Sequence, residues 1–123
     1  MATILIVEDE EEMQELLQMA LKRAGHEVVA CLNGVEALYL ATYHQPDLIV
    51  LDLMMPLASG DAVLGFIRST DAIKDIPVLI VSAHPNGARL AHQLEADGFL
   101  PKPLAMQDLT AQVEALLQAA AKA

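Results

Sequence analysis

A chain of 123 residues, 54% of them hydrophobic, is long enough to bury one core without cross-links, and its single Cys31 excludes an internal disulfide. Seventeen acidic residues against seven basic ones give a formal net charge of −10, which repels phosphate backbones and argues against direct nucleic-acid binding. No apolar run approaches the roughly 18 residues that cross a bilayer, and no secretory signal opens the chain. We therefore expect a soluble cytoplasmic protein without membrane contact, whose charge suits divalent cations and basic partners.

The first half of the chain alternates apolar runs with amphipathic segments. Residues 3–8 form an apolar, β-branched run that ends in acid and predicts a strand. Residues 26–32 predict a second, less apolar strand, and Asn33 is placed to cap the helix that follows and ends before Pro46. Between the strands at residues 3–8 and 26–32, the sequence predicts a helix that ends at Gly25. The residues expected on its inward face are Met13, Leu16, Leu17, Ala20, Leu21 and Ala24.

The most apolar strand runs from Leu48 to Leu51 and leads directly into Asp52. Pro46 and Pro56 bound this segment, and so short a run of Leu, Ile and Val is typical of a strand buried on both faces inside a parallel sheet. An acid at the carboxyl end of such a strand lies where the sheet meets solvent. Asp52 is therefore the first candidate for a functional residue.

The second half of the chain continues the alternation. A helix begins near Ser59, a buried strand spans residues 77–82, a modest helix spans residues 86–97, and a short strand at residues 98–101 precedes the final helix. The inward residues expected of these three helices are, in order, Val63, Phe66 and Ile67; Ala88, Ala91 and Leu94; and Leu109, Val113, Leu116, Leu117 and Ala120.

Five expected strands alternate with five expected helices, and neither a linker nor an internal repeat interrupts them. This pattern predicts an α/β fold, a doubly wound five-stranded parallel sheet covered by helices on both faces, as one domain over residues 1–123. Doubly wound sheets bind ligands outside the carboxyl ends of their strands, where the strand order reverses. In the flavodoxin-like order 2-1-3-4-5, that point lies between the strands that lead to Glu8 and Asp52.

Chemical groups gather at these predicted strand ends. Three carboxylates, a hydroxyl and an ammonium converge there, from Glu8, Asp9, Asp52, Ser82 and Lys102. Two carboxylates ~5 Å apart repel by roughly 3 kcal/mol at an effective dielectric constant of about 20, and one lysine does not offset three acids. Mg²⁺, a divalent cation that prefers hard oxygen ligands, suits this charge balance. With the cation present, Asp52 can act as a nucleophile toward a phosphoryl group, whose oxygens the cation, Ser82 and Lys102 would neutralise.

Several short motifs stand at these positions. They are Ile6-Val7-Glu8-Asp9-Glu10, Pro46-Asp47, Asp52-Leu53-Met54-Met55-Pro56, Gly60, Val81-Ser82-Ala83 and Lys102-Pro103. In this combination the chain resembles the response-regulator receiver (CheY-like) family of two-component signalling over essentially its whole length. The resemblance implies one receiver domain over residues 1–123 and, as is usual in this family, a cis peptide bond within the last motif.

The resemblance implies that Asp52 accepts a phosphoryl group from a sensor histidine kinase, a phosphotransfer protein or a small donor such as acetyl phosphate. It implies that Asp9 and Asp52 ligate Mg²⁺ directly, together with the backbone carbonyl of Met54. Glu8 stands where the family more often has Asp and would act on the ion through a bound water. Because the reaction is self-phosphorylation followed by self-dephosphorylation, we expect a switch rather than an enzyme.

Further positions carry implied roles. Ser82 and Lys102 would hold phosphoryl oxygens. Phe99 matches the aromatic residue whose rotamer couples to Ser82 on activation, with Phe in place of the frequent Tyr. Met54 and His84 occupy positions that tune the lifetime of the phosphoryl group in this family.

The resemblance also implies an output surface over residues 86–123, where a downstream protein partner would bind, with the chain a monomer or a phosphorylation-dependent dimer.

Three alternatives remain. A degenerate receiver would bind a partner without phosphorylation. A phosphatase of the haloacid-dehalogenase type would need a second acid where Met54 stands. A flavodoxin would place a flavin phosphate against the acids of residues 8–12, which would repel it.

Overall fold

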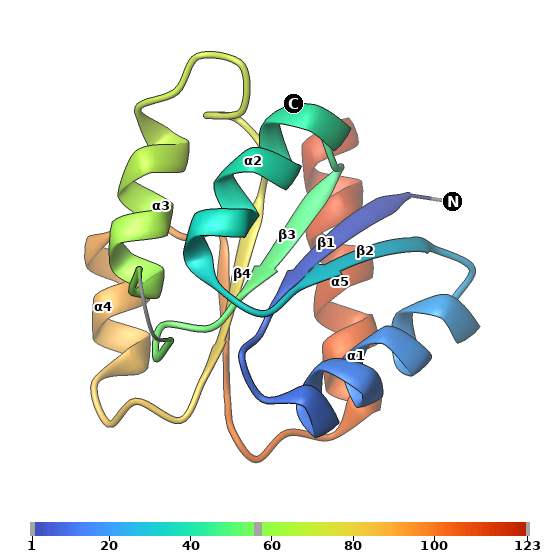
Figure 1. The fold of residues 1–123 in the computed structure, drawn as a ribbon. Coiled ribbons are helices and arrows are strands. Elements are labelled where there is room, and N and C mark those ends of the chain that lie inside the picture. Colours follow the sequence, from blue (N-terminus) through green and yellow to red (C-terminus); the bar gives the residue numbers. More distant parts are fainter. Residues whose placement is uncertain (1, 56–57, 123) are drawn as a thin grey trace.

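The computed structural model describes residues 2–55 and 58–122, and there five strands alternate with five helices (Figure 1). The elements are, in chain order, β1 (Thr3–Val7), α1 (Glu11–Arg23), β2 (Glu27–Cys31), α2 (Gly34–His44), β3 (Leu48–Leu51), α3 (Gly60–Arg68), β4 (Val78–Ser82), α4 (Gly87–Gln93), β5 (Gly98–Pro101) and α5 (Met106–Ala121). Within the described residues, no helix combines the length and the apolar character that a membrane span needs.

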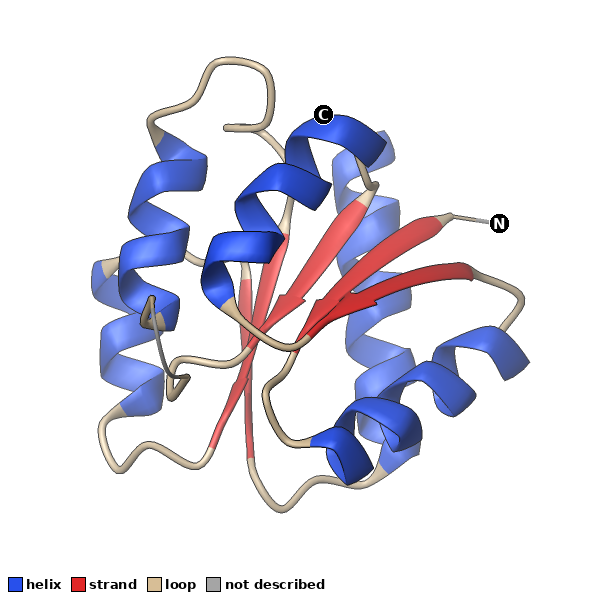
Figure 2. Cartoon of the chain, in the orientation of Figure 1, coloured by secondary structure: helices blue, strands red, loops and turns tan. Residues whose placement is uncertain are grey.

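The strands form one parallel sheet in the order β2-β1-β3-β4-β5, which confirms the predicted doubly wound, flavodoxin-like fold. Figure 2 shows helices on both sides of the sheet. Because successive side chains of a strand point to opposite faces, β1 contributes to two separate cores. Ile4 and Ile6 pack in the core that α1 and α5 cover. Leu5 and Val7 pack in the core that α2, α3 and α4 cover.

The central strand β3 sets the position of the candidate acid. All four of its residues are at most 1% exposed, as a strand covered on both faces requires. It pairs with β1 on one side and β4 on the other, and Val7 is the register partner of Leu51. The next residues, Glu8 and Asp52, therefore leave the sheet side by side at its carboxyl edge.

Some predicted inward positions lie on the solvent side of their helices. Phe66 of α3 is 54% exposed, and Leu64 is buried between Val63 and Ile67 instead. Leu16 of α1 is 49% exposed. At about 100° per residue, a stripe can shift by one position without changing its period, so hydrophobicity alone does not choose between neighbouring positions. The other expected inward residues that are exposed are Ala24, Ala88 and Ala120.

Helix α4 is shorter than the predicted segment 86–97, because it ends at Gln93. Leu94 is its C-cap, and Glu95 adopts the left-handed conformation with φ of 61°. Leu94 and Ala96 still pack against the core after the helix has ended. Their apolar character therefore extends the predicted helix beyond its real end.

Arg68, the last residue of α3, connects three segments at the amino edge of the sheet. Its guanidinium donates to the carbonyl oxygens of Lys74 at 3.0 Å and Ile76 at 2.8 Å. It also donates to Oδ2 of Asp97 at 2.7 Å, and the same oxygen accepts the N–H of Val78 at 2.8 Å. One planar group with several donors thus holds the end of α3, the start of β4 and the turn before β5 together.

We expect Arg68→Lys to lower the free energy of unfolding by about 2 kcal/mol, because lysine keeps the charge but lacks the planar, forked set of donors that reaches both carbonyls and the carboxylate. Urea unfolding followed by circular dichroism measures this change. Arg89→Lys, at an exposed position of α4, is the matched control and should stay within about 0.5 kcal/mol of the parent. Equal losses in the two variants would contradict the role of the guanidinium.

Candidate functional site

Three carboxylates meet at the carboxyl edge of the sheet, beyond β1 and β3. One carboxylate oxygen each from Glu8, Asp9 and Asp52 lies within 4.8 Å of the other two. Glu8 is 1% exposed and Asp52 is 5% exposed, whereas Asp9 faces solvent. Buried charges of one sign are costly unless cations offset them, so this cluster calls for positive partners.

Lys102, directly after β5, supplies one positive charge. Its Nζ donates to Oε1 of Glu8 at 2.5 Å and to Oδ2 of Asp52 at 3.1 Å. Its backbone N–H donates to the carbonyl of Ser82 at 3.0 Å, which extends the pairing of β4 and β5 by one residue. The peptide bond between Lys102 and Pro103 is cis, as the resemblance implies.

The loop after Asp52 holds the other side of its carboxylate. The backbone N–H of Met54 donates to Oδ1 of Asp52 at 3.0 Å, so each carboxylate oxygen has its own donor. Gly60, the first residue of α3, fastens this loop, because its N–H donates to the carbonyl of Leu53 at 3.1 Å. Pro56, predicted to bound this segment, lies outside the described residues.

A cavity of about 230 Å³ opens over these groups. Two residues of its wall, Glu10 and Ala83, are not predicted from the sequence. Each directly follows a predicted site residue, and that adjacency is the signal that could have identified them. The residues that line the cavity are Glu8, Asp9, Glu10, Asp52, Met54, Ala83 and Lys102.

Three further candidates stand outside this lining. Ser82 ends β4, is 1% exposed, and accepts the N–H of His84 on its Oγ at 3.2 Å. Nδ1 of His84 accepts the N–H of Asn86 at 3.0 Å. Phe99 is a half-buried residue of β5 and the register partner of Ile80. The structure therefore places these three candidates on β4, on β5 and on the loop between β4 and α4, outside the lining of the cavity over the acid cluster.

Burial changes the protonation of the acid cluster. It raises the pKa of Glu8 to about 7, against the hydrogen bond from Lys102, and the negative charge of Asp52 adds to the rise. Burial also acts to lower the pKa of Lys102, but its hydrogen bond with Glu8 and the charge of Asp52 outweigh that effect and raise this pKa. Lys102 is therefore positive at neutral pH, while Glu8 is close to its midpoint.

The cluster fits a magnesium ion. Mg²⁺ uses one or two protein carboxylates and keeps several of its waters. The oxygens of Asp9 and Asp52 offer the carboxylates, and the exposed side of Asp9 leaves room for water. One ammonium does not neutralise three acids, so a divalent cation also improves the charge balance.

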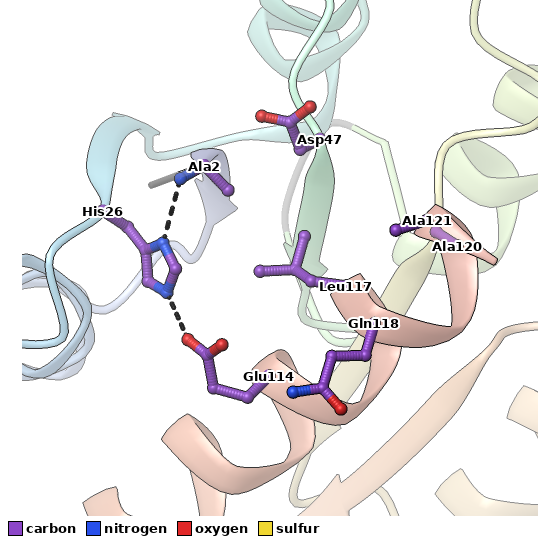
Figure 3. A pocket seen from close by; sticks show the side chains of 8 residues that line it. All are labelled: Ala2, His26, Asp47, Glu114, Leu117, Gln118, Ala120 and Ala121. Carbon is purple, nitrogen blue, oxygen red and sulfur yellow. Dashed lines mark hydrogen bonds and ion pairs between the residues drawn. The ribbon is translucent and has the colours of Figure 1, made fainter.

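A larger cavity of about 470 Å³ lies at the opposite edge of the sheet (Figure 3). There Nδ1 of His26 accepts the N–H of Ala2 at 3.2 Å, and its Nε2 lies 2.7 Å from Oε1 of Glu114. The N–H of Thr3 donates to Oδ2 of Asp47 at 2.8 Å. These contacts tie the start of β1 to α5 and to the segment before β3, and no predicted site residue lines this cavity.

Comparison with known proteins adds an independent result. The family model described as "Response regulator receiver domain" matches residues 4–114. Over 117 residues the chain is 38% identical to the response regulator MprA of Mycobacterium sp. (strain KMS) and to the transcriptional regulatory protein PrrA of Mycobacterium tuberculosis. The match covers 94% of this chain, but 50% and 49% of those proteins. The chain thus spans about half the length of these curated relatives.

Solved structures show the same similarity. A receiver domain of a signal transduction histidine kinase from Syntrophus aciditrophicus is 30% identical, with a TM-score of 0.89 over 97% of this chain and 92% of that one. The chemotaxis protein CheY4 of Vibrio cholerae is 27% identical, with a TM-score of 0.87 over 94% of this chain and 98% of that one. The likeness therefore covers the sheet, its helices and the strand ends that carry the acids.

Proposed function

Because the chain belongs to the response regulator receiver family, whose members are phosphorylation-dependent switches of two-component signalling, we propose that Asp52 is its phosphoryl acceptor. One observation carries this proposal above the others. The carboxylate of Asp52 follows the central strand and accepts a hydrogen bond from Lys102, and one of its oxygens lies within 4.8 Å of oxygens from two more acids, Glu8 and Asp9. A carboxylate held in this way is a nucleophile beside its own charge-neutralising groups.

Receivers of this family generally bind Mg²⁺ in an acidic pocket, and we propose that the acid cluster does so here. Asp9, Asp52 and the backbone carbonyl of Met54 would hold the ion directly, and Glu8 would act through a water. When bound, the ion supplies positive charge that lets a carboxylate and a phosphoryl group approach each other.

The residues of the chain divide the remaining work. An oxygen of Asp52 forms the new O–P bond, while the P–N bond of a phosphohistidine or the P–O bond of acetyl phosphate breaks and the imidazole or acetate leaves with its electron pair. The ammonium of Lys102, already on Asp52, would hold a phosphoryl oxygen, and the hydroxyl of Ser82 would hold another. The N–H of Met54 keeps Oδ1 of Asp52 oriented.

Phosphorylation would then change the protein surface. We propose that Phe99 responds to Ser82, and that Met54 and His84 set how long the phosphoryl group persists. Receivers interact with histidine kinases and with downstream effectors. Here the donor would be a sensor histidine kinase or a phosphotransfer protein in the cytoplasm, and the effector would bind over residues 86–123, to a monomer or a phosphorylation-dependent dimer. The chain would act on no substrate other than its own acceptor.

We expect Mg²⁺ and acetyl phosphate to add about 80 Da to the parent protein, the mass of one phosphoryl group, and to add nothing to Asp52→Asn. Intact-mass spectrometry at neutral pH measures the adduct. Asp75→Asn, an exposed acid before β4, is the matched control and should be modified like the parent. Removing Mg²⁺ with a chelator should prevent the adduct.

Two outcomes would contradict the proposal. A parent protein that stays unmodified with acetyl phosphate and other small donors would favour the degenerate receiver, which binds partners without phosphorylation. Catalytic turnover of a phosphate ester would favour the phosphatase.

A further inference from the structure

Gly87, the first residue of α4, is a buried glycine in a helix, where glycine is disfavoured relative to alanine. The reason lies in the ring of Phe99. A Cβ added at Gly87 would lie 2.7 Å from Cε1 and 2.8 Å from Cζ of that ring, closer than carbon atoms approach each other. The ring therefore occupies the place that any other residue at position 87 would fill.

The ring of Phe99 is half-buried. Phe99 belongs to β5 and packs against the core that includes Ile80 and Ala91. The atoms nearest to Gly87 are at the far end of the ring, so a larger residue there would displace the side chain rather than the strand. The rotamer of Phe99 thus depends on the absence of a side chain at position 87.

A chain of hydrogen bonds connects Gly87 to Ser82. Oγ of Ser82 accepts the N–H of His84 at 3.2 Å. The carbonyl of His84 accepts the N–H of Gly87 at 3.0 Å, and its ring Nδ1 accepts the N–H of Asn86 at 3.0 Å. One residue, His84, therefore links the hydroxyl at the end of β4 to the start of α4.

We propose that Gly87 is a positioning residue for Phe99: it provides the space in which the ring lies, and the loop through His84 transmits movements of Ser82 to that space. The functional consequence rests on the proposed phosphorylation of Asp52. If Ser82 moves toward a phosphoryl group, His84 and Gly87 move with it, and the ring has to change its position. The position of the Phe99 ring would therefore depend on where the backbone of α4 places Gly87, as well as on Ser82.

The first test uses the full chain labelled with 4-fluorophenylalanine. The protein contains two phenylalanines, Phe66 and Phe99, so ¹⁹F NMR gives two signals, which Phe99→Leu assigns. Gly87→Ala should shift the signal of Phe99 and leave that of Phe66 in place. Gly65→Ala is the matched control, since a Cβ at this helical glycine meets no atom within 4 Å, and it should leave the Phe99 signal unchanged. An unchanged Phe99 signal in Gly87→Ala would overturn the proposal.

A double-mutant cycle keeps the test decisive if Gly87→Ala folds poorly. Alanine favours a helix over glycine, so Gly87→Ala should raise the urea midpoint once the ring is absent, in the Phe99→Ala background. In the parent background the same change should be less favourable, because the methyl group meets the ring. Equal effects in the two backgrounds would overturn the proposed contact.

The last test adds Mg²⁺ and acetyl phosphate. In the parent, phosphorylation should shift the Phe99 signal, and in Gly87→Ala this shift should fall by at least about twofold while the mass adduct on Asp52 still forms. An undiminished shift would overturn the proposed transmission. If the parent gains no adduct, the proposed function fails, and the two tests without phosphoryl donor still decide whether Gly87 positions Phe99.

Discussion

Replacing Gly60 with alanine is expected to lower the free energy of unfolding by about 3 kcal/mol, the largest loss we expect of a single methyl group in this chain. A Cβ at Gly60 would lie against the carbonyl oxygen of Asp52 and 2.5 Å from Cα of Leu53. Both are backbone atoms of the segment that leaves the central strand, so no side chain can rotate to make room. The loop that carries Asp52 would have to move away from α3.

Urea unfolding of Gly60→Ala and Gly65→Ala separates this clash from helix propensity. Both glycines lie in α3, but a Cβ at Gly65 meets no atom within 4 Å. Gly65→Ala should therefore stabilise the protein by up to about 1 kcal/mol. If both substitutions stabilise the protein, the close approach of α3 to the Asp52 loop is wrong. A folded Gly60→Ala should also show slower phosphorylation by acetyl phosphate, because Gly60 fastens the loop that orients Asp52.

The sheet edge that carries the acids could be predicted because each strand is a short apolar run with a clear end. Val7 and Leu51 are the last buried apolar residues before Glu8 and Asp52, and the ends of parallel strands must share one edge. The order of the strands then brings those two ends next to each other. Both steps use only local hydrophobicity and topology, which a sequence contains.

The contacts made beyond the strand ends could not be predicted in the same way. Gln14 lies on the flank of α1, and its amide donates to the carbonyls of Cys31 at 2.9 Å and Glu8 at 3.4 Å, which holds the ends of β2 and β1 together. The sequence shows only a polar residue beside the apolar stripe of a helix, and it does not show which backbone carbonyls the amide of that residue reaches. The same is true of Gly60 and Gly87, because a glycine does not reveal which atoms occupy the space beside it.

The Glu8 carboxyl should make the stability of the metal-free protein fall as the pH rises from about 5 to about 7. Its pKa is about 7 in the folded chain against an ordinary value of 4.5, so in this range the folded protein binds a proton that the unfolded chain has released. More bound protons in the folded state mean that stability decreases with pH. The full decrease is about 3 kcal/mol, and it is complete once the pH exceeds the folded pKa.

Glu8→Gln is the matched variant, because it keeps the size and the buried position of the side chain but cannot ionise. Chemical unfolding at several pH values with a chelator present should show the decrease in the parent and a much flatter profile in Glu8→Gln. A decrease of the same size in Glu8→Gln would assign the effect to another group.

Magnesium should oppose this trend, because the cation favours the ionised form of Glu8. The apparent affinity for Mg²⁺ should therefore rise with pH, by up to about tenfold per unit below pH 7, and level off above it. Added Mg²⁺ should restore part of the stability lost near neutral pH, since a ligand that binds only the folded state stabilises it. In Glu8→Gln the affinity should vary little with pH over the same range. A parent affinity that is independent of pH would mean that Mg²⁺ binding does not change the protonation of Glu8, and it would contradict the proposed coupling of this carboxylate to the metal site.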